Sequence, residues 1–216
     1  MGFAKSWVAV KGVSRDHALA ALGLQGTGTF EELAESSFDG APLPSGWYLI
    51  EGECGDERLL GPERLGRLSS VGEVVTVSVE EHVMFSVASG WSKGRERWSV
   101  THASEESLDH LAVVGNPPAP FGEIRERLFA EQRSEDESNE LTNQIGGGAD
   151  HIFDIPVELG LALTGYRYDV DIEGAGDLPF EVLVPVAAQP RPNAAPRRAR
   201  TVRKQEPSFW KRLFGG

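Results

Sequence analysis

The fold is decided by residues 73–81, EVVTVSVEE, in which valines at alternate positions are separated by threonine, serine and glutamate. A period of two is typical of a strand that buries one face and leaves the other polar. The extended pattern continues over residues 83–88 and returns at 97–102, after a polar turn at 92–94. We therefore expect a hairpin or meander at the centre of an antiparallel sheet.

On the N-terminal side of this meander, the sequence predicts further strands and short helices. Ser14 is a suitable N-cap and Gly23 a suitable stop for a short helix. Pro62 suits the first position of another helix, which we expect to reach Leu68. The remaining expectations are a strand at 7–10, a long surface loop at 23–45, a buried strand at 46–50 and a hairpin that turns at 55–56 into residues 58–60.

On the C-terminal side, the strongest helix signal lies in residues 121–131, whose apolar side chains fall on one helical face. A further helix is expected from Pro156 to Gly165. The other expectations are strands at 111–114, 166–172 and 180–186, and a mobile loop at about 133–150 that is first acidic and then glycine-rich. Runs of strands with few inserted helices predict an α+β fold, with a mainly antiparallel sheet of about six to eight strands and two or three helices.

Charge is unevenly divided along the 216 residues, whose net charge is −12. Residues 189–216 hold eight basic residues and one acidic residue, whereas residues 1–188 hold 13 basic and 32 acidic residues, a net charge of −19. We therefore expect an acidic domain at 1–188. Residues 189–208 should form a disordered basic linker, because four prolines and many charges cannot bury a core.

The last eight residues, 209–216, form a separate amphipathic motif. If this motif is helical, its aromatic and leucine side chains share one face and its two basic side chains lie opposite. So short a helix is unstable alone in water and should fold only on a surface. That surface is a partner protein, the chain's own acidic domain or an anionic membrane, whereas the charge of the domain disfavours nucleic acid. The expected binding residues are Phe209, Trp210, Lys211, Arg212, Leu213 and Phe214.

Common catalytic and metal-binding motifs are missing from the sequence, including the dinucleotide fingerprint, the P-loop, the nucleophile elbow and paired-cysteine or HExxH metal patterns. We expect no metal and no cofactor. The remaining candidates for acid–base chemistry lie near predicted strands and helices: Glu81, His82, His102 and Asp154. Paired as expected, His82 and His102 lie toward opposite ends of a two-strand ladder, which argues against a joint role.

Residues 166–169, YRYD, allow two interpretations. They could form the rim of a ligand site. Alternatively, Arg167 and Asp169 form an ion pair on one face of a strand while the tyrosines pack on the other. The structural interpretation is favoured.

Several segments resemble a group of uncharacterised bacterial single-domain proteins. The resemblance covers roughly residues 5–172 and leaves out the tail, and a histidine stands in that group where Tyr168 stands here. The group has no known activity, so it implies only a bacterial, cytoplasmic protein. The matching segments are Trp7-x-Ala9-Val10-x-Gly12, Gly46-Trp47-Tyr48-Leu49, Val79-Glu80-Glu81-His82-Val83-Met84 with Trp91, Trp98-x-Val100-x-His102, Ile155-Pro156-Val157-Glu158-Leu159 and Leu163-Thr164-Gly165-Tyr166-Arg167.

Together these observations favour a non-catalytic bacterial interaction protein that uses its C-terminal tail to bind a partner or a membrane surface. Two alternatives stay open. One is a small hydrolase-like enzyme that uses the histidine and carboxylate candidates. The other is an immunity-type inhibitor whose acidic face covers a basic toxin site. The chain shows no secretory signal and no apolar run of about 20 residues, which favours the cytoplasm, with membrane association through the tail as a variant.

Overall fold

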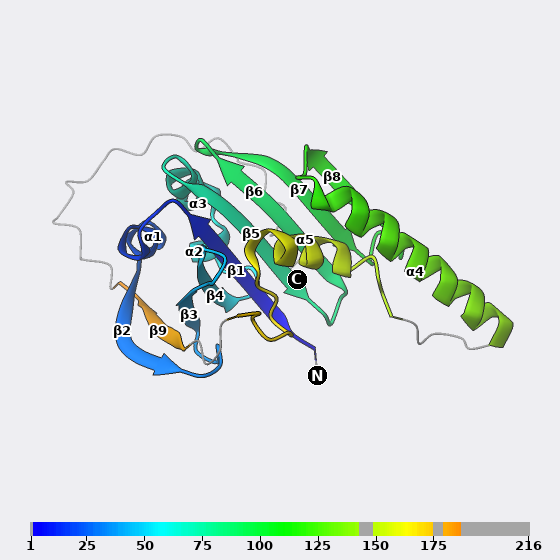
Figure 1. Ribbon diagram of the computed structural model, residues 1–216, viewed down its shortest axis with the longest axis horizontal. Helices are drawn as coiled ribbons and strands as arrows, with labels where there is room; N and C mark the ends of the chain where they lie inside the picture. Colours follow the sequence, from blue (N-terminus) through cyan, green and yellow to red (C-terminus); the bar gives the residue numbers. More distant parts are fainter. Residues whose placement is uncertain (1, 143–148, 175–178, 187–216) are drawn as a thin grey trace, which may run out of the picture. The chain divides into compact units, whose positions relative to one another are not determined.

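A computed structural model describes residues 2–142, 149–174 and 179–186. Within these residues the chain forms an antiparallel sheet of nine strands with helices on both faces, which confirms the α+β class (Figure 1). Met1–Pro185 is one compact unit, close to the expected domain at 1–188. The expected linker at 189–208 and the amphipathic motif at 209–216 lie outside the described residues.

The nine described strands are arranged in the order β2-β9-β3-β4-β1-β5-β6-β7-β8. The strand bounds are β1 Ala4–Lys11, β2 Leu24–Glu31, β3 Phe38–Pro42, β4 Tyr48–Glu53, β5 Glu73–Glu80, β6 Phe85–Ser92, β7 Arg95–Ala103, β8 Ala112–Gly115 and β9 Phe180–Pro185. The helix bounds are α1 Arg15–Leu22, α2 Glu57–Leu60, α3 Pro62–Ser69, α4 Pro120–Thr142 and α5 Asp154–Thr164. Nine strands and five helices exceed the expected six to eight strands and two or three helices.

The predicted meander is confirmed as β5, β6 and β7, which pair in sequence order. The alternating Val75, Val77 and Val79 of β5 all pack into the core on one face of the sheet, whereas Val74 packs into the core on the other face. One face carries a core under α4 and α5, and the opposite face carries a core under α1, α2 and α3. Four tryptophans lie in or against these cores: Trp7, Trp47, Trp91 and Trp98.

Two of the predicted helices are bounded as the sequence indicates. The Ser14 hydroxyl accepts a hydrogen bond from the His17 amide at the start of α1, and Gly23 ends the helix in the left-handed conformation at φ 70°. Pro62 occupies the first turn of α3. No helix of the described residues combines the length and the apolarity needed to cross a lipid bilayer.

The expected surface loop at 23–45 is wrong, because it contains β2 and β3. Neither strand shows the apolar alternation of β5. Strand β2 is an exposed edge strand rich in glycine and threonine. Strand β3 contains Gly40, where a Cβ atom would lie 2.6 Å from the Tyr48 hydroxyl, so glycine is required for the tyrosine to pack. The sequences of β2 and β3 therefore reflect their exposure and their close contacts, and they lack the apolar alternation by which a half-buried strand is recognised.

Three further expectations are corrected. Residues 58–60 belong to the short helix α2, not to a hairpin, because the Asp56 side chain caps the Arg58 amide. Residues 166–172 form no strand. Helix α4 continues through residues 133–142, where a mobile loop was expected, and side-chain bonds one turn apart, such as Gln132 to Asp136, accompany its polar part. Residues 143–148 of that expected loop lie outside the described residues.

Candidate binding site

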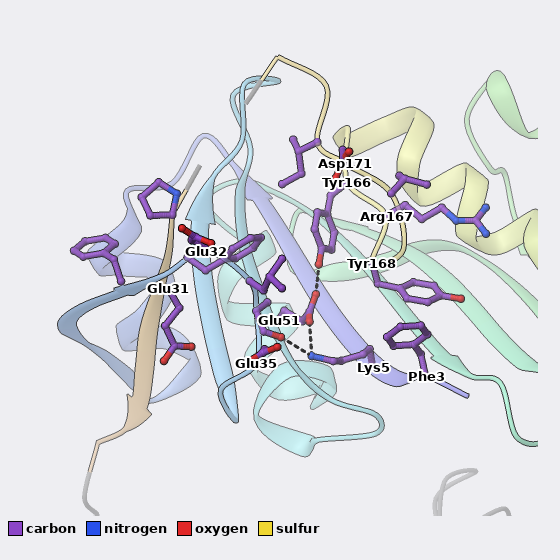
Figure 2. A pocket seen from close by; sticks show the side chains of 17 residues that line it. Phe3, Lys5, Glu31, Glu32, Glu35, Glu51, Tyr166, Arg167, Tyr168 and Asp171 are labelled. Carbon is purple, nitrogen blue, oxygen red and sulfur yellow. Dashed lines mark hydrogen bonds and ion pairs between the residues drawn. The ribbon is translucent and has the colours of Figure 1, made fainter. Parts of the chain in front are cut away.

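A cavity of about 900 Å³ opens beside the N-terminal end of β1 (Figure 2). Volumes of this size are typical of sites that hold a small molecule or a few side chains of a partner. Its walls come from β1, from the end of β2 with the segment after it, and from the residues between α5 and β9. The lining residues are Phe3, Lys5, Phe30, Glu31, Glu32, Leu33, Ala34, Glu35, Glu51, Tyr166, Arg167, Tyr168, Val170, Asp171, Ile172, Pro179 and Phe180.

A buried carboxylate, Glu51, lies at the base of the cavity. Its side chain is on the face of the sheet that Trp7 shares, since the two residues are register partners on β4 and β1. The Lys5 ammonium donates to Glu51 Oε1 at 2.7 Å, and the Tyr166 hydroxyl donates to Oε2. Figure 2 shows the carboxylate held between these two groups. Both oxygens are therefore occupied, which explains how a charge only 3% exposed is accommodated.

Aromatic rings form the apolar floor beside this carboxylate. The fully buried Trp7 ring meets the Tyr166 ring edge-on at 5.6 Å between centroids, and the Tyr168 ring lies 5.9 Å away. Phe3 packs against Tyr168 at 5.2 Å. Burial and the neighbouring Glu51 raise the pKa of Tyr166 well above its ordinary value, so its hydroxyl remains a donor. The floor is thus aromatic, and the Tyr166 hydroxyl within it is already paired with Glu51.

Both cations that line the cavity are already paired. Lys5 is bound to Glu51 and also donates to the Ala34 carbonyl at 3.0 Å. Arg167 donates to Asp169 Oδ1 at 2.5 Å and to Asp154 Oδ1 at 2.9 Å. The ion pair between Arg167 and Asp169 confirms that part of the structural interpretation, although the residues lie in a turn and not in a strand. The tyrosines nevertheless line the cavity, so the segment also contributes to a candidate ligand site.

The rim of the cavity combines exposed apolar side chains with unpaired acids. Among the described residues, the carboxylates of Glu32, Glu35 and Asp171 have no ion pair, and all three are exposed. Four of the ten exposed large apolar side chains of the described residues also line this cavity: Phe3, Phe30, Leu33 and Val170. Exposed apolar groups gathered in one place mark interaction sites.

Behind one wall of the cavity lies a second buried carboxylate, Asp39, which is 1% exposed. It faces Glu51 across the β3–β4 pair. Its Oδ2 accepts from the Ser36 amide at 2.9 Å, whereas Oδ1 has no partner among the described residues. Burial raises the pKa of Asp39 to about 6.

The four acid–base candidates have four separate sets of partners, and none of them lines the cavity. Glu81 accepts from the Phe3 amide and the Tyr168 hydroxyl. Asp154 binds Arg167, and burial raises the pKa of its carboxyl. The exposed His82 binds Glu80, whereas the fully buried His102 contacts Asp150 and the His110 carbonyl.

The expectation that His82 and His102 lie at opposite ends of a ladder is wrong. His82 lies in the turn before β6, and Phe85 at the start of β6 pairs with Ala103. Both histidines are therefore at the same end of the sheet. No group of three or more potential metal ligands occurs among the described residues. The thiol of Cys54 is half-buried, and burial raises its pKa.

Of the residues that build the cavity, the sequence pointed only to Tyr166, Arg167 and Tyr168, as the less favoured interpretation of residues 166–169. Glu51 was a signal that could have been noticed, because an acid directly after the buried run Tyr48–Ile50 needs a partner. The acids and apolar residues at 31–35 fall within the expected surface loop at 23–45, where no periodic pattern groups them into a site. The expected binding residues 209–214 lie outside the described residues.

The fold and the cavity define an α+β domain with an acidic, aromatic-floored cavity that is a candidate binding site. Known proteins add nothing to this description, since no protein family, no curated protein and no solved structure matches the chain.

Proposed function

We propose that this protein is a non-catalytic interaction protein whose cavity binds a basic peptide segment with an apolar anchor. The observation that carries the proposal is the composition of the rim, where exposed apolar side chains alternate with unpaired carboxylates. An aromatic or aliphatic anchor would cover the apolar groups, and a lysine or arginine beside it would complete the ion pairs that the rim lacks. Aromatic and arginine side chains often dominate the energetics of protein interfaces.

The C-terminal motif at 209–214 belongs to this class of ligand. Its proposed binders remain a partner protein, the acidic domain or an anionic membrane. The acidic rim also favours an immunity-type inhibitor, in which the basic segment would belong to a toxin. A hydrolase-like activity has no comparable support, because its four candidate residues are engaged with separate partners.

The acidic rim is testable with a peptide probe, the acetylated and amidated hexapeptide of residues 209–214, FWKRLF. We expect the combined Glu32→Gln and Glu35→Gln substitutions to weaken its binding to the full-length protein about tenfold, since each exposed ion pair contributes up to ~1 kcal/mol. Fluorescence anisotropy of a labelled peptide in about 50 mM salt measures the change.

A matched control removes the same charge elsewhere. Glu105 and Glu106 are exposed in the turn after β7 and do not line the cavity, so the combined Glu105→Gln and Glu106→Gln substitutions should leave the affinity unchanged. If both pairs of substitutions weakened peptide binding equally, the loss of affinity would come from the change in net charge alone, which would contradict a binding site at the rim. Binding of a peptide with Lys211→Glu and Arg212→Glu would contradict the need for a cation.

Truncation after residue 188 tests the division between domain and tail. We expect Tm to change by less than about 2 °C, because all described strands and both cores lie before that residue and surface changes rarely exceed ~0.5 kcal/mol. The truncated protein should lose flotation with anionic liposomes or capture of its partner. Unchanged behaviour in both assays rejects a binding role for the tail.

A further inference from the structure

The cavity wall that contains Ala34 and Glu35 is held by a cation that lines the cavity and by a buried carboxyl behind the wall. The Lys5 ammonium binds the Ala34 carbonyl, and Asp39 Oδ2 binds the Ser36 amide. The Ser36 hydroxyl in turn donates to Glu31, at the end of β2. Asp39 is therefore separated from the cavity by one thin layer of chain, although it does not itself line the cavity.

The charges that surround Asp39 do not balance. From β2 it faces Glu31, from β4 it faces Glu51 and from β1 it faces Lys5. The phenol of Tyr166 approaches from above the sheet, and on β9 the register partner is the uncharged Val182. Three carboxylates thus share one ammonium, which already binds Glu51, and Asp39 Oδ1 has no partner among the described residues. The group therefore holds fewer cations than carboxylates.

We propose that Asp39 is a specificity-determining charge of the cavity: its ionised form strengthens the selection of a cationic side chain by the acidic rim, and its protonated form weakens that selection. The inference rests on the proposed function, because it takes the ligand to be cationic. Asp39 acts through the wall by its electric field and not by contact. Such a field is strong because a buried charge is poorly screened by solvent and salt.

The direction of the pH dependence follows from linkage. A cation in the cavity stabilises the ionised form of Asp39, so the pKa of this carboxyl must be lower in the complex than the value of about 6 in the free protein. At pH values above that pKa, the Asp39 carboxyl is already ionised when the ligand binds. At lower pH values, binding must displace the proton from this carboxyl. The affinity should therefore rise with pH through about 6 and become constant above it.

The test uses the full-length protein and the same FWKRLF probe, which carries no group that titrates between about pH 5 and 8 once its ends are blocked. We expect its affinity to fall about tenfold from pH 7.5 to pH 5, since each unit by which the ligand shifts the pKa of Asp39 corresponds to a factor of ten. Asp39→Asn should make the profile flat. Glu35→Gln, on the exposed rim, should lower the affinity at every pH and keep the midpoint.

The possible outcomes separate this inference from the proposed function. Binding with no pH dependence, or with the same midpoint after Asp39→Asn, overturns the role of Asp39 and leaves the binding site standing. Absence of binding at every pH overturns both. A carbon-detected NMR titration of the ligand-free protein is independent of any probe, and a midpoint below about 5 for the Asp39 carboxyl, near the ordinary aspartate value, overturns the inference alone.

Discussion

Asp39→Asn is expected to raise the free energy of unfolding at pH 8 by up to about 3 kcal/mol, because the pKa of Asp39 rises from 3.8 to about 6 on folding and each unit is equivalent to 1.36 kcal/mol. The folded protein therefore holds this proton more tightly than the unfolded chain does. Asparagine keeps the oxygen that accepts from the Ser36 amide and carries no charge, so it resembles the protonated form at every pH.

The sign of this effect fixes its pH window. Because folding raises the pKa of Asp39, proton binding by this carboxyl stabilises the fold at pH values below its pKa in the unfolded chain. This contribution is lost as the pH rises through its pKa in the folded protein. The variant and the parent should therefore be nearly equal in stability below pH 4, diverge through pH 6 and differ by a constant amount above pH 7. Urea unfolding at pH 4 and pH 8 measures this, with Asp171→Asn on the exposed rim as the neutral control. A constant difference at both pH values would show that the gain has another origin.

His102→Ala is expected to lower the free energy of unfolding by about 3 kcal/mol or more, the cost of removing one partner from a buried polar pair and leaving a cavity. The His102 ring is completely buried on β7. Its Nδ1 donates to the His110 carbonyl at 2.8 Å, and its Nε2 lies 3.0 Å from Asp150 Oδ2. It therefore fastens the segment before α5 to the sheet.

His82→Ala is the matched control at the same end of the sheet. The His82 side chain is 61% exposed and binds only Glu80 through its ring, so its removal should change stability by less than about 0.5 kcal/mol. Thermal or urea unfolding of both variants gives the comparison. Equal losses would mean that burial of the His102 ring contributes little to the fold.

The central part of the fold could be predicted because one local pattern governs it. Strands β5 to β7 follow each other in sequence and pair in that order, so the alternation at 73–81 indicated both the strand and its neighbours. The two ends of α1 could be predicted for a similar reason, since Ser14 and Gly23 each bond to residues within one turn of the helix end that they cap.

Apart from residues 166–168, the cavity could not be predicted, because it depends on contacts between distant residues. Glu51 is held by Lys5 and Tyr166, which stand 46 and 115 residues away in sequence. Local sequence shows an acid inside a strand but not the partners that allow its burial. The same holds for β2, whose glycines and threonines form a strand only because β9 supplies hydrogen bonds from the other end of the domain.

The position of β9 has a consequence for the order in which the protein is completed during synthesis. Strands β2 and β3 are adjacent in sequence, yet β9 lies between them in the sheet, and β2 pairs with no other described strand. A nascent chain that ends before residue 180 therefore exposes two unpaired strand edges, which are the usual starting points of aggregation. Because the end of β2 forms one wall of the cavity, the binding site is assembled only after nearly the whole domain has been translated.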